Sequence, residues 1–352
     1  MESESERDAH RLAEAVRFGR SILPAVSRTF ALSIRVLPGE LGRAVLTAYL
    51  LCRIADTLED EPVQPAADKA ALLDELLRCF DDSSAADAFP ARVSAISGEP
   101  AHVRLTRRAD LVFVLYRSLS SATRAHVRRW VSEMIVGMRK FVLLYPLGIR
   151  IQSLEEYREY CYYVAGTVGY LLTDLWHEHA PSIGQQRYEV LRERCRAFAE
   201  ALQTVNILKD VATDAEQENS IYIPEELLRE HGSSHAEILH ADRLRGTRAA
   251  LATMVTLAQK DLEGARNYLL LIPRRAVPIR LFCVLPLLFA YATLRDLTHL
   301  PQAMAQRHVV KISRREVKSL TLIGFLVILS NRGLSWLADR AMRRPFVLAG
   351  VR

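Results

Sequence analysis

Apolar residues recur at intervals of three and four along most of the chain, which is the spacing of one face of an α-helix. The pattern predicts ten helices, at 8–20, 40–59, 67–80, 104–118, 122–144, 154–178, 184–214, 246–270, 276–298 and 314–341. The one extended stretch is 220–224, and residues 82–100 form the most loop-like segment. Short connections between long helices favour an all-α, antiparallel assembly.

The bulk composition is that of a globular protein with a large core. Half of the 352 residues are hydrophobic, which suits a single domain over 1–352 with an N-terminal helix or tail at 1–20. The formal charge of +6 is spread along the chain, and no nucleic-acid-binding motif is present. Nucleic acid is therefore not expected as a partner, and anionic small molecules or an anionic membrane surface fit better.

Cysteine usage and the two ends of the chain bear on the cellular compartment. The five cysteines form no CxxC pair, which favours buried, reduced thiols in the cytoplasm. The acidic N-terminus does not have the pattern of a signal peptide. The apolar helix expected at 318–342 contains a strongly apolar stretch at 320–329, well short of the roughly 20 residues that span a bilayer. A buried core helix is predicted there, and attachment to a membrane surface is the alternative.

The helix predicted at 40–59 ends in a group of carboxylates. Asp56, Glu59 and Asp60 are spaced by three and four residues, so they share one helical face. The residues before them are apolar, and burying like charges together is costly. Arg53 lies one turn before Asp56 and compensates part of that charge. A further cation is expected beside the group.

A second helix carries a stripe of oxygen-bearing side chains. Gln203, Asn206, Asp210 and Asp214 lie near one another along it, again within apolar sequence. Magnesium prefers oxygen ligands and bridges phosphates. A single pair of aspartates four residues apart usually marks a solvated surface. Two such groups in apolar helices, about 150 residues apart, instead predict opposed helices that hold magnesium and a diphosphate.

Five stretches together resemble the squalene and phytoene synthases, which are head-to-head prenyltransferases, over about residues 27–317. They are SRTF at 27–30, RIADTLED at 53–60, YCYYVAGTVG at 160–169, QTVNILKD at 203–210 with Asp214, and FC at 282–283 with Pro286 and VKI at 310–312. The resemblance implies a farnesyl-diphosphate farnesyltransferase with the isoprenoid-synthase fold, a single helical domain around a central cavity.

The resemblance also implies roles for individual residues. Two or three magnesium ions, with manganese as a substitute, would be held by Asp56, Glu59, Asp60, Asn206, Asp210 and Asp214. Tyr160 would act as the acid or base beside the four aspartates, and Gly166 and Gly169 would leave room for it or allow close helix packing. The residues implied in binding substrate or cofactor are Ser27, Arg28, Tyr49, Arg53, Gln203, Asn206, Lys209, Phe282, Lys311 and Arg314.

The FC and VKI segments favour squalene as the product. Two farnesyl diphosphates would form presqualene diphosphate, which NADPH would reduce. Lys311 and Arg314 would contact NADPH without a Rossmann unit, because no GxGxxG sequence is present. Phytoene or dehydrosqualene formation without NADPH is the alternative, and a non-catalytic scaffold is a third hypothesis. The chain is expected to be a monomer or a weak homo-oligomer, with peripheral membrane contact left open.

Two positions depart from the family pattern. Lys209 replaces the usual arginine, which keeps the charge but loses the two-pronged hydrogen bonding of a guanidinium group. After Asp214, a Gly-Arg pair is replaced by Glu218-Asn219 and the segment is one residue longer. Lys209 or an arginine from another helix is expected to supply the missing phosphate contact. A separate basic group is interpreted as a solvated surface: Arg124, His126, Arg128 and Arg129.

Overall fold

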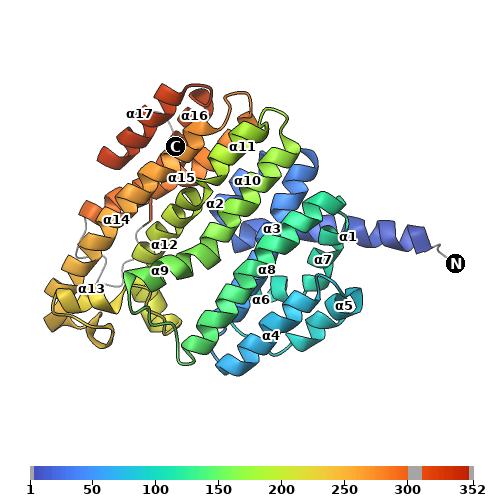
Figure 1. The fold of residues 1–352 in the computed structure, drawn as a ribbon, viewed down its shortest axis with the longest axis horizontal. Helices are drawn as coiled ribbons and strands as arrows, with labels where there is room; N and C mark the ends of the chain where they lie inside the picture. The colour runs from blue at the N-terminus through green and yellow to red at the C-terminus, as the bar shows by residue number, and fades with distance from the viewer. Residues whose placement is uncertain (1–3, 300–310, 349–352) are drawn as a thin grey trace. The chain divides into compact units, whose positions relative to one another are not determined.

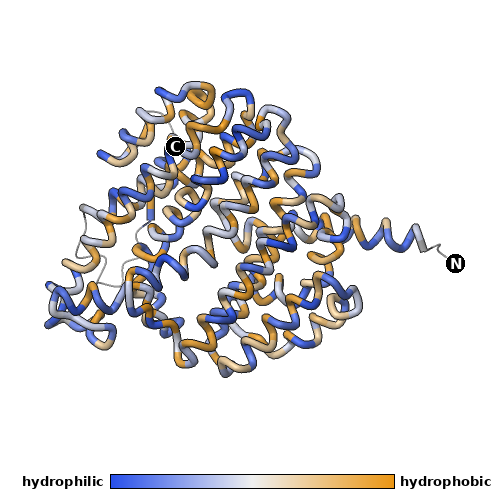
Figure 2. The backbone as a smooth tube through the Cα atoms, viewed as in Figure 1, coloured by the Kyte–Doolittle hydropathy of each residue, from blue (hydrophilic) through white to orange (hydrophobic). Residues whose placement is uncertain are grey.

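The protein is described by a computed structural model over residues 4–299 and 311–348, in which helices are joined by short loops (Figure 1). This part of the chain contains no β-strand, and one parallel bridge joins Arg150 to Ile221 in the predicted extended stretch. Hydrophobic and polar residues alternate along most helices (Figure 2), as expected of helices with one buried face. The prediction of an all-α protein is confirmed.

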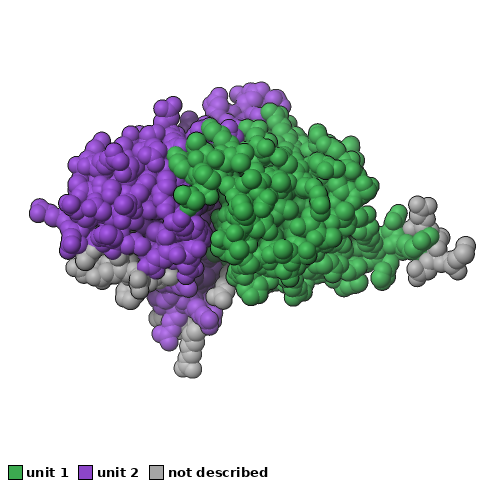
Figure 3. All heavy atoms as spheres, turned by 90° about the horizontal axis from the view of Figure 1, so that it is seen from below, with its two compact units in different colours: residues 1–147, 174–179 green, residues 148–173, 180–352 purple. Residues whose placement is uncertain are grey.

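Internal contacts divide the chain into two compact units (Figure 3). Unit 1 holds residues 1–147 and 174–179, and unit 2 holds residues 148–173 and 180–352. The single domain expected over 1–352 stays a prediction, because dense contacts within each unit do not decide whether the two fold separately.

Unit 1 is built around α3 (Gly39–Glu59), in which 13 of 21 residues are buried. Helices α1, α4, α6, α7 and α8 all pack against it. Capping residues explain where several of these helices begin. At α8, for example, the hydroxyl of Ser120 accepts a hydrogen bond from the backbone N–H of Thr123. The other helices are α1 (Glu4–Val26), α2 (Arg28–Arg35), α4 (Ala66–Arg78), α5 (Ser83–Arg92), α6 (Pro100–Thr106), α7 (Ala109–Arg117) and α8 (Ser121–Leu144).

Unit 2 has a core of three long helices, α12 (Cys195–Gln217), α14 (Leu244–Leu271) and α15 (Val277–His299), with α12 packed against both others. By length and composition α15 is the one described helix that could cross a membrane, but 83% of its most apolar window is buried, as in a core helix. The remaining elements are α9 (Leu154–Cys161), a π-helical turn η1 (Tyr162–Gly166), α10 (Thr167–His179), α11 (Gln185–Arg192), α13 (Glu225–Glu230), the 3-10 turns η2 (His235–Glu237) and η3 (Ala241–Arg243), α16 (Arg314–Leu326) and α17 (Asn331–Arg343). Helix α10 is divided, because its residues 174–179 belong to unit 1.

Several expected helices differ from those observed. The helices predicted at 104–118, 184–214 and 314–341 are each two helices, and the loop predicted at 82–100 is wrong because α5 occupies much of it. The apolar stretch at 320–329 was expected to be a buried core helix. That expectation is wrong for its outer face, where Leu322, Phe325, Leu326 and Leu329 are exposed. The five cysteines are free and four are buried, as predicted.

Candidate active site

The acidic end of α3 contains an ion pair and two aspartates one turn apart. Arg53 Nη1 lies 3.2 Å from Asp56 Oδ2, and the Asp56 side chain keeps 25% exposure. Asp60, at the C-cap of the helix, is exposed, whereas Glu59 is buried. Asp56 and Asp60 are therefore the two carboxylates of this group that a dissolved ion can reach most easily.

The electrostatics of this pair leave it under-compensated. Burial raises the pKa of Asp56 above its usual value, and Arg53 only partly opposes the shift. Burial also works against the charge on Arg53, yet Asp56, Tyr49 and Asp60 raise the pKa of that guanidinium. Arg53 Nε is buried and makes no hydrogen bond within the described residues. A divalent cation would stabilise the desolvated carboxylate, so the residues fit the magnesium that the family resemblance implies.

The SRTF segment lies beside this pair through Tyr49. The Tyr49 hydroxyl donates to the carbonyl of Val26 (3.4 Å) and accepts from Arg53 Nη2 (3.5 Å), and its ring packs on Phe30 at 5.5 Å between centroids. Ser27 caps α2 by accepting from the N–H of Phe30. The segment thus supports the position of Arg53. The side chain of Arg28, a predicted diphosphate ligand, lies outside the described residues.

His102 of α6 is a neighbour of the ion pair that the sequence pattern did not single out. Burial first, and then the charge of Arg53, lower the pKa of His102, while Asp56 raises it. No residue spacing links α6 to α3, so only the packing of the two helices brings this imidazole close. His102 adds a titratable group next to the candidate metal ligands.

The second acidic group lies along α12. Lys209 Nζ is 3.0 Å from Asp210 Oδ2, with 28% and 32% of the two side chains exposed. Asn206 is exposed, and Gln203 and Asp214 are partly exposed. All the predicted residues of this stripe are therefore at least partly accessible to solvent.

Tyr160 lies in a buried aromatic pair. It is 4% exposed, and its ring stacks on Tyr222 with 4.9 Å between centroids. Tyr222 in turn lines a narrow crevice with Asp214 and Val211. The structure therefore places Tyr222, which the sequence reasoning had not chosen, between the predicted proton-transfer residue and the end of the acidic stripe.

The turn after Asp214 contains an arginine from a distant segment. Asn219 has a left-handed backbone (φ 49°), and Gly148 (φ 113°) packs so closely that a Cβ there would lie 1.9 Å from the Asn219 carbonyl oxygen. Arg150 donates to the backbone carbonyl and to Oδ1 of Asn219. Asn219 occupies the place of the family's Gly-Arg pair, so the structure brings Arg150 to the position where an arginine was expected to be missing. Arg150 lies in the loop between α8 and α9, whereas the substituting arginine was expected on another helix.

A preformed metal site is not found in the described residues, since no three His, Cys, Asp or Glu side chains come close enough to hold an ion. The two acidic groups belong to different units: Asp56 and Asp60 to unit 1, and Asp210 and Asp214 to unit 2. The predicted opposition of the two helices stays a prediction. Each group supplies two accessible carboxylates, which fits a metal that is bound jointly by protein and diphosphate oxygens.

The residues expected to bind NADPH or the substrate chain are spread over unit 2. Phe282 is 2% exposed in the core helix α15. Lys311 and Arg314 are exposed at the start of α16, and Val310 of the VKI segment lies outside the described residues. Their predicted roles stay predictions.

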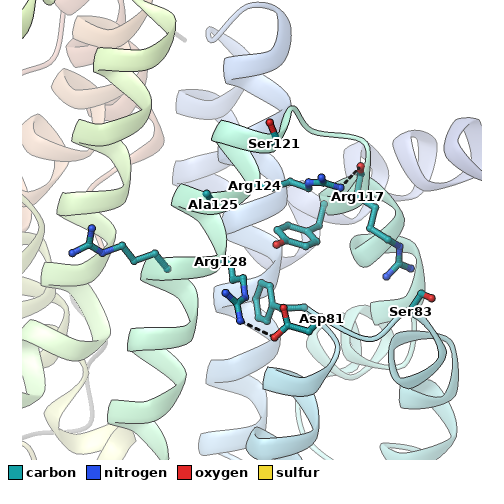
Figure 4. A pocket seen from close by; sticks show the side chains of 10 residues that line it. Asp81, Ser83, Arg117, Ser121, Arg124, Ala125 and Arg128 are labelled. Carbon is teal, nitrogen blue, oxygen red and sulfur yellow. Dashed lines mark hydrogen bonds and ion pairs between the residues drawn. The ribbon is translucent and has the colours of Figure 1, made fainter.

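The basic group of α8 lines a separate surface pocket of about 570 Å³ (Figure 4). Arg128 pairs with Asp81 at 2.7 Å, and Arg124 donates to the backbone carbonyl of Arg117. His126 instead lies 3.4 Å from Asp174. No residue of the acidic groups lines this pocket, and most of its charged side chains are exposed, which agrees with the interpretation as a solvated surface.

The comparisons with known proteins agree with the sequence motifs. The squalene/phytoene synthase family matches residues 23–316. The chain belongs to this family. Squalene synthase 1 of Arabidopsis thaliana is 26% identical over 299 residues, 84% of this chain and 68% of that protein. The squalene synthase of Schizosaccharomyces pombe is 26% identical over 306 residues, 86% of this chain and 63% of that protein.

Solved structures show the fold of the family. A ligand complex of TcSQS has a TM-score of 0.77 at 23% identity and covers 94% of this chain and 98% of that one. A ligand complex of a dehydrosqualene synthase has a TM-score of 0.62 at 20% identity, with 94% and 99% covered. The isoprenoid-synthase fold is thereby confirmed. The expected prenyltransferase activity is supported by the family match and the curated relatives. The matches span about two thirds of the curated relatives' length.

Proposed function

We propose that this protein is a squalene synthase, which condenses two farnesyl diphosphates to presqualene diphosphate and reduces that intermediate to squalene with NADPH. The observation that carries the proposal is the Arg53–Asp56 pair, a partly accessible carboxylate whose charge is incompletely compensated. It lies in a family member that keeps a second acidic stripe on α12.

The chain's own charged groups would bind and orient the diphosphates. Asp56 and Asp60 on one helix and Asp210 and Asp214 on the other would hold magnesium, which supplies a Lewis acid that stabilises the departing diphosphate. Arg53 has an unused donor at Nε and would hydrogen-bond to a diphosphate oxygen. Lys209 would add a single positive charge beside Asp210.

Removal of a proton during cyclopropane formation would fall to Tyr160. Its ring is buried and stacked on Tyr222, so water has little access to it. The faces of the two rings also present negative electrostatic potential, which stabilises a nearby carbocation. Tyr160→Phe would keep the stacked pair and remove only the hydroxyl.

The reductive half of the reaction is assigned to the start of α16. Lys311 and Arg314 are exposed there, and both would pair with cofactor phosphates. The reaction would take place in the cytoplasm, by a monomer or a weak homo-oligomer. A dehydrosqualene synthase is the second candidate, supported by the similarity to a solved enzyme of that name.

Product analysis separates the two candidates. The purified protein is incubated with farnesyl diphosphate and magnesium, with and without NADPH, and the hydrocarbons are identified by mass spectrometry. Squalene that forms only with NADPH is expected. Dehydrosqualene under both conditions would favour the second candidate, and release of no diphosphate under any condition would contradict both.

A further inference from the structure

Exposed large apolar side chains are concentrated along the sequence in the last two helices of unit 2 and the segments that follow each of them. Thirteen are exposed in the described residues, and six of these fall within residues 322–347. Single exposed apolar residues are normal on a protein surface, whereas a concentrated group indicates an interaction. The six are Leu322, Phe325, Leu326, Leu329, Trp336 and Val347.

The exposure follows from the two faces of α16. Its inner face consists of Glu316, Ser319, Leu320 and Gly324, which are buried, and α16 packs on α15. Three of the exposed apolar residues, at 322, 325 and 326, are spaced by three and four and therefore share the opposite face. Leu329, in the turn that follows, is 57% exposed. The exposed side of α16 is thus basic in its first half, at residues 314, 315 and 318, and apolar in its second half.

This face is held firmly in place. Arg295 of α15 and Glu316 of α16 form a two-pronged ion pair with distances of 2.7 and 3.1 Å, and both side chains are almost fully buried. Arg280 donates to the carbonyl of Ile328 in the turn and to the side chain of Asn331 at the start of α17. The exposed apolar residues therefore belong to an anchored element, and fraying does not explain them.

The same segment is strongly basic. Residues 311–347 contain eight basic and two acidic side chains, a net formal charge of +6, which equals that of the whole chain. Both acidic side chains are already paired, Glu316 with Arg295 and Asp339 with Arg266. The basic residues are Lys311, Arg314, Arg315, Lys318, Arg332, Arg340, Arg343 and Arg344. A second copy of this segment would be repelled, so the charge favours an anionic partner.

Apolar and aromatic side chains flanked by basic ones are the composition of a helix that lies in a membrane interface. We propose that the outer face of α16, the turn at 327–330 and Trp336 dock on an anionic lipid surface without crossing the bilayer. The most apolar helix, α15, is buried and takes no part. The face lies beyond the family match, which ends at residue 316. The proposal goes beyond the proposed function, because this binding needs no farnesyl diphosphate.

Tryptophan fluorescence offers a built-in test. Of the three tryptophans, Trp130 and Trp176 are buried, whereas Trp336 is 54% exposed. Vesicles of phosphatidylcholine with phosphatidylglycerol are expected to shift the emission of the full chain to shorter wavelength, and phosphatidylcholine alone is not. Trp336→Phe should remove the shift while the protein still sediments with the anionic vesicles.

Two sets of variants separate the apolar and the electrostatic contributions. Leu322→Ser with Phe325→Ser and Leu326→Ser is expected to lower partitioning into anionic vesicles at least about tenfold. Arg315→Gln with Lys318→Gln and Arg332→Gln should weaken the preference for anionic lipid and its dependence on salt. The matched control, Val190→Ser with Arg194→Gln, removes one exposed residue of each kind from the same unit and should bind normally.

Two results would overturn the proposal. One is an unchanged emission and no sedimentation with anionic vesicles at low salt. The other is a dimer in analytical ultracentrifugation that the three serine substitutions convert to a monomer, without any effect on vesicles, since the apolar face would then be a protein interface. Circular dichroism checks that each variant remains folded. Because binding is measured without substrate, an inactive enzyme that still binds would contradict only the proposed function.

Discussion

The two acidic helices each hold an aspartate beside a basic side chain, but the surroundings of the two pairs differ. On α3, burial raises the pKa of Asp56, and its partner Arg53, whose side chain is 29% exposed, also contacts Tyr49. On α12, Asp210 pairs with its neighbour Lys209, and both side chains are about 30% exposed. The exposed fractions of the two pairs are similar, so they differ instead in the burial that raises the pKa of Asp56 and in the contact of Arg53 with Tyr49. A substitution in the α3 pair is therefore expected to change both stability and the site, whereas one in the α12 pair is expected to act mainly on the site.

The largest effect is expected from removing one carboxylate of either helix. Asp56→Asn and Asp210→Asn should each lower kcat about 1,000-fold, because each removes a charged metal ligand. Circular dichroism should show nearly unchanged helical content. Near-normal turnover in either variant, measured by diphosphate release, would remove that helix from the candidate site.

The cations beside the carboxylates should differ in importance. Arg53→Gln is expected to lower kcat/KM about 100-fold and to lower the melting temperature, since it leaves Asp56 desolvated without its partner. Lys209→Gln should lower kcat/KM about tenfold and leave the melting temperature nearly unchanged, because a partly exposed ion pair between neighbouring residues adds little stability. Lys209→Arg is the control and should be at least as active as the natural protein. Equal losses of stability in the two glutamine variants would contradict the proposed difference between the two helices.

The pH dependence of activity and stability tests the Arg53–Asp56 pair directly. Asp56 must be ionised to bind metal, so activity is expected to fall in acid as pH drops through its raised pKa. Arg53→Gln should move this acid limb to higher pH, because Arg53 lowers the Asp56 pKa. A raised carboxyl pKa also means that ionised Asp56 destabilises the fold above that pKa. Asp56→Asn should therefore be more stable than the natural protein at neutral pH, and this advantage should vanish in strong acid. Thermal unfolding across pH checks the sign.

The smallest effect is expected at the turn after Asp214. Arg150→Gln should raise KM for farnesyl diphosphate about threefold, if this guanidinium supplies a weak phosphate contact from an exposed loop. The control is Asn219→Gly, which keeps the left-handed backbone and removes only the side-chain acceptor. A normal KM in the control together with a raised KM in Arg150→Gln supports the contact. Equal changes in both variants would assign Arg150 to holding the turn.

The sequence pattern predicted elements well where one helix has both clear ends and a continuous buried face. Helices α3 and α8 begin within one residue of expectation, after Pro38 and at the Ser120 cap. The pattern did not predict helix ends at residues that commonly occur inside helices. Helices α6 and α7 are separated only at Arg107 and Arg108, where neither proline nor glycine marks the end. Helix α5 was missed because it buries only Ala86 and Phe89, too few residues to set a period.

The site was predictable as two motifs but not as a set of neighbours. Spacing identified the aspartates and Arg53, since these lie on single helices. It gave no signal for His102, Tyr222 or Arg150, whose positions depend on contacts between distant segments. Hydrophobicity likewise indicated that α16 is apolar but not which side is buried. Burial is a property of the neighbouring helix α15, which a local pattern does not contain.

One glycine limits how this enzyme can change. A Cβ on Gly169 would lie 2.4 Å from the backbone carbonyl oxygen of Cys195, at the start of α12. Any larger residue would push away the helix that bears Asp210 and Asp214. Side chains that shape the product can therefore vary by mutation. The distance between the backbones of α10 and α12 cannot be changed at Gly169 by a single substitution. New chain-length preferences must arise elsewhere in the fold.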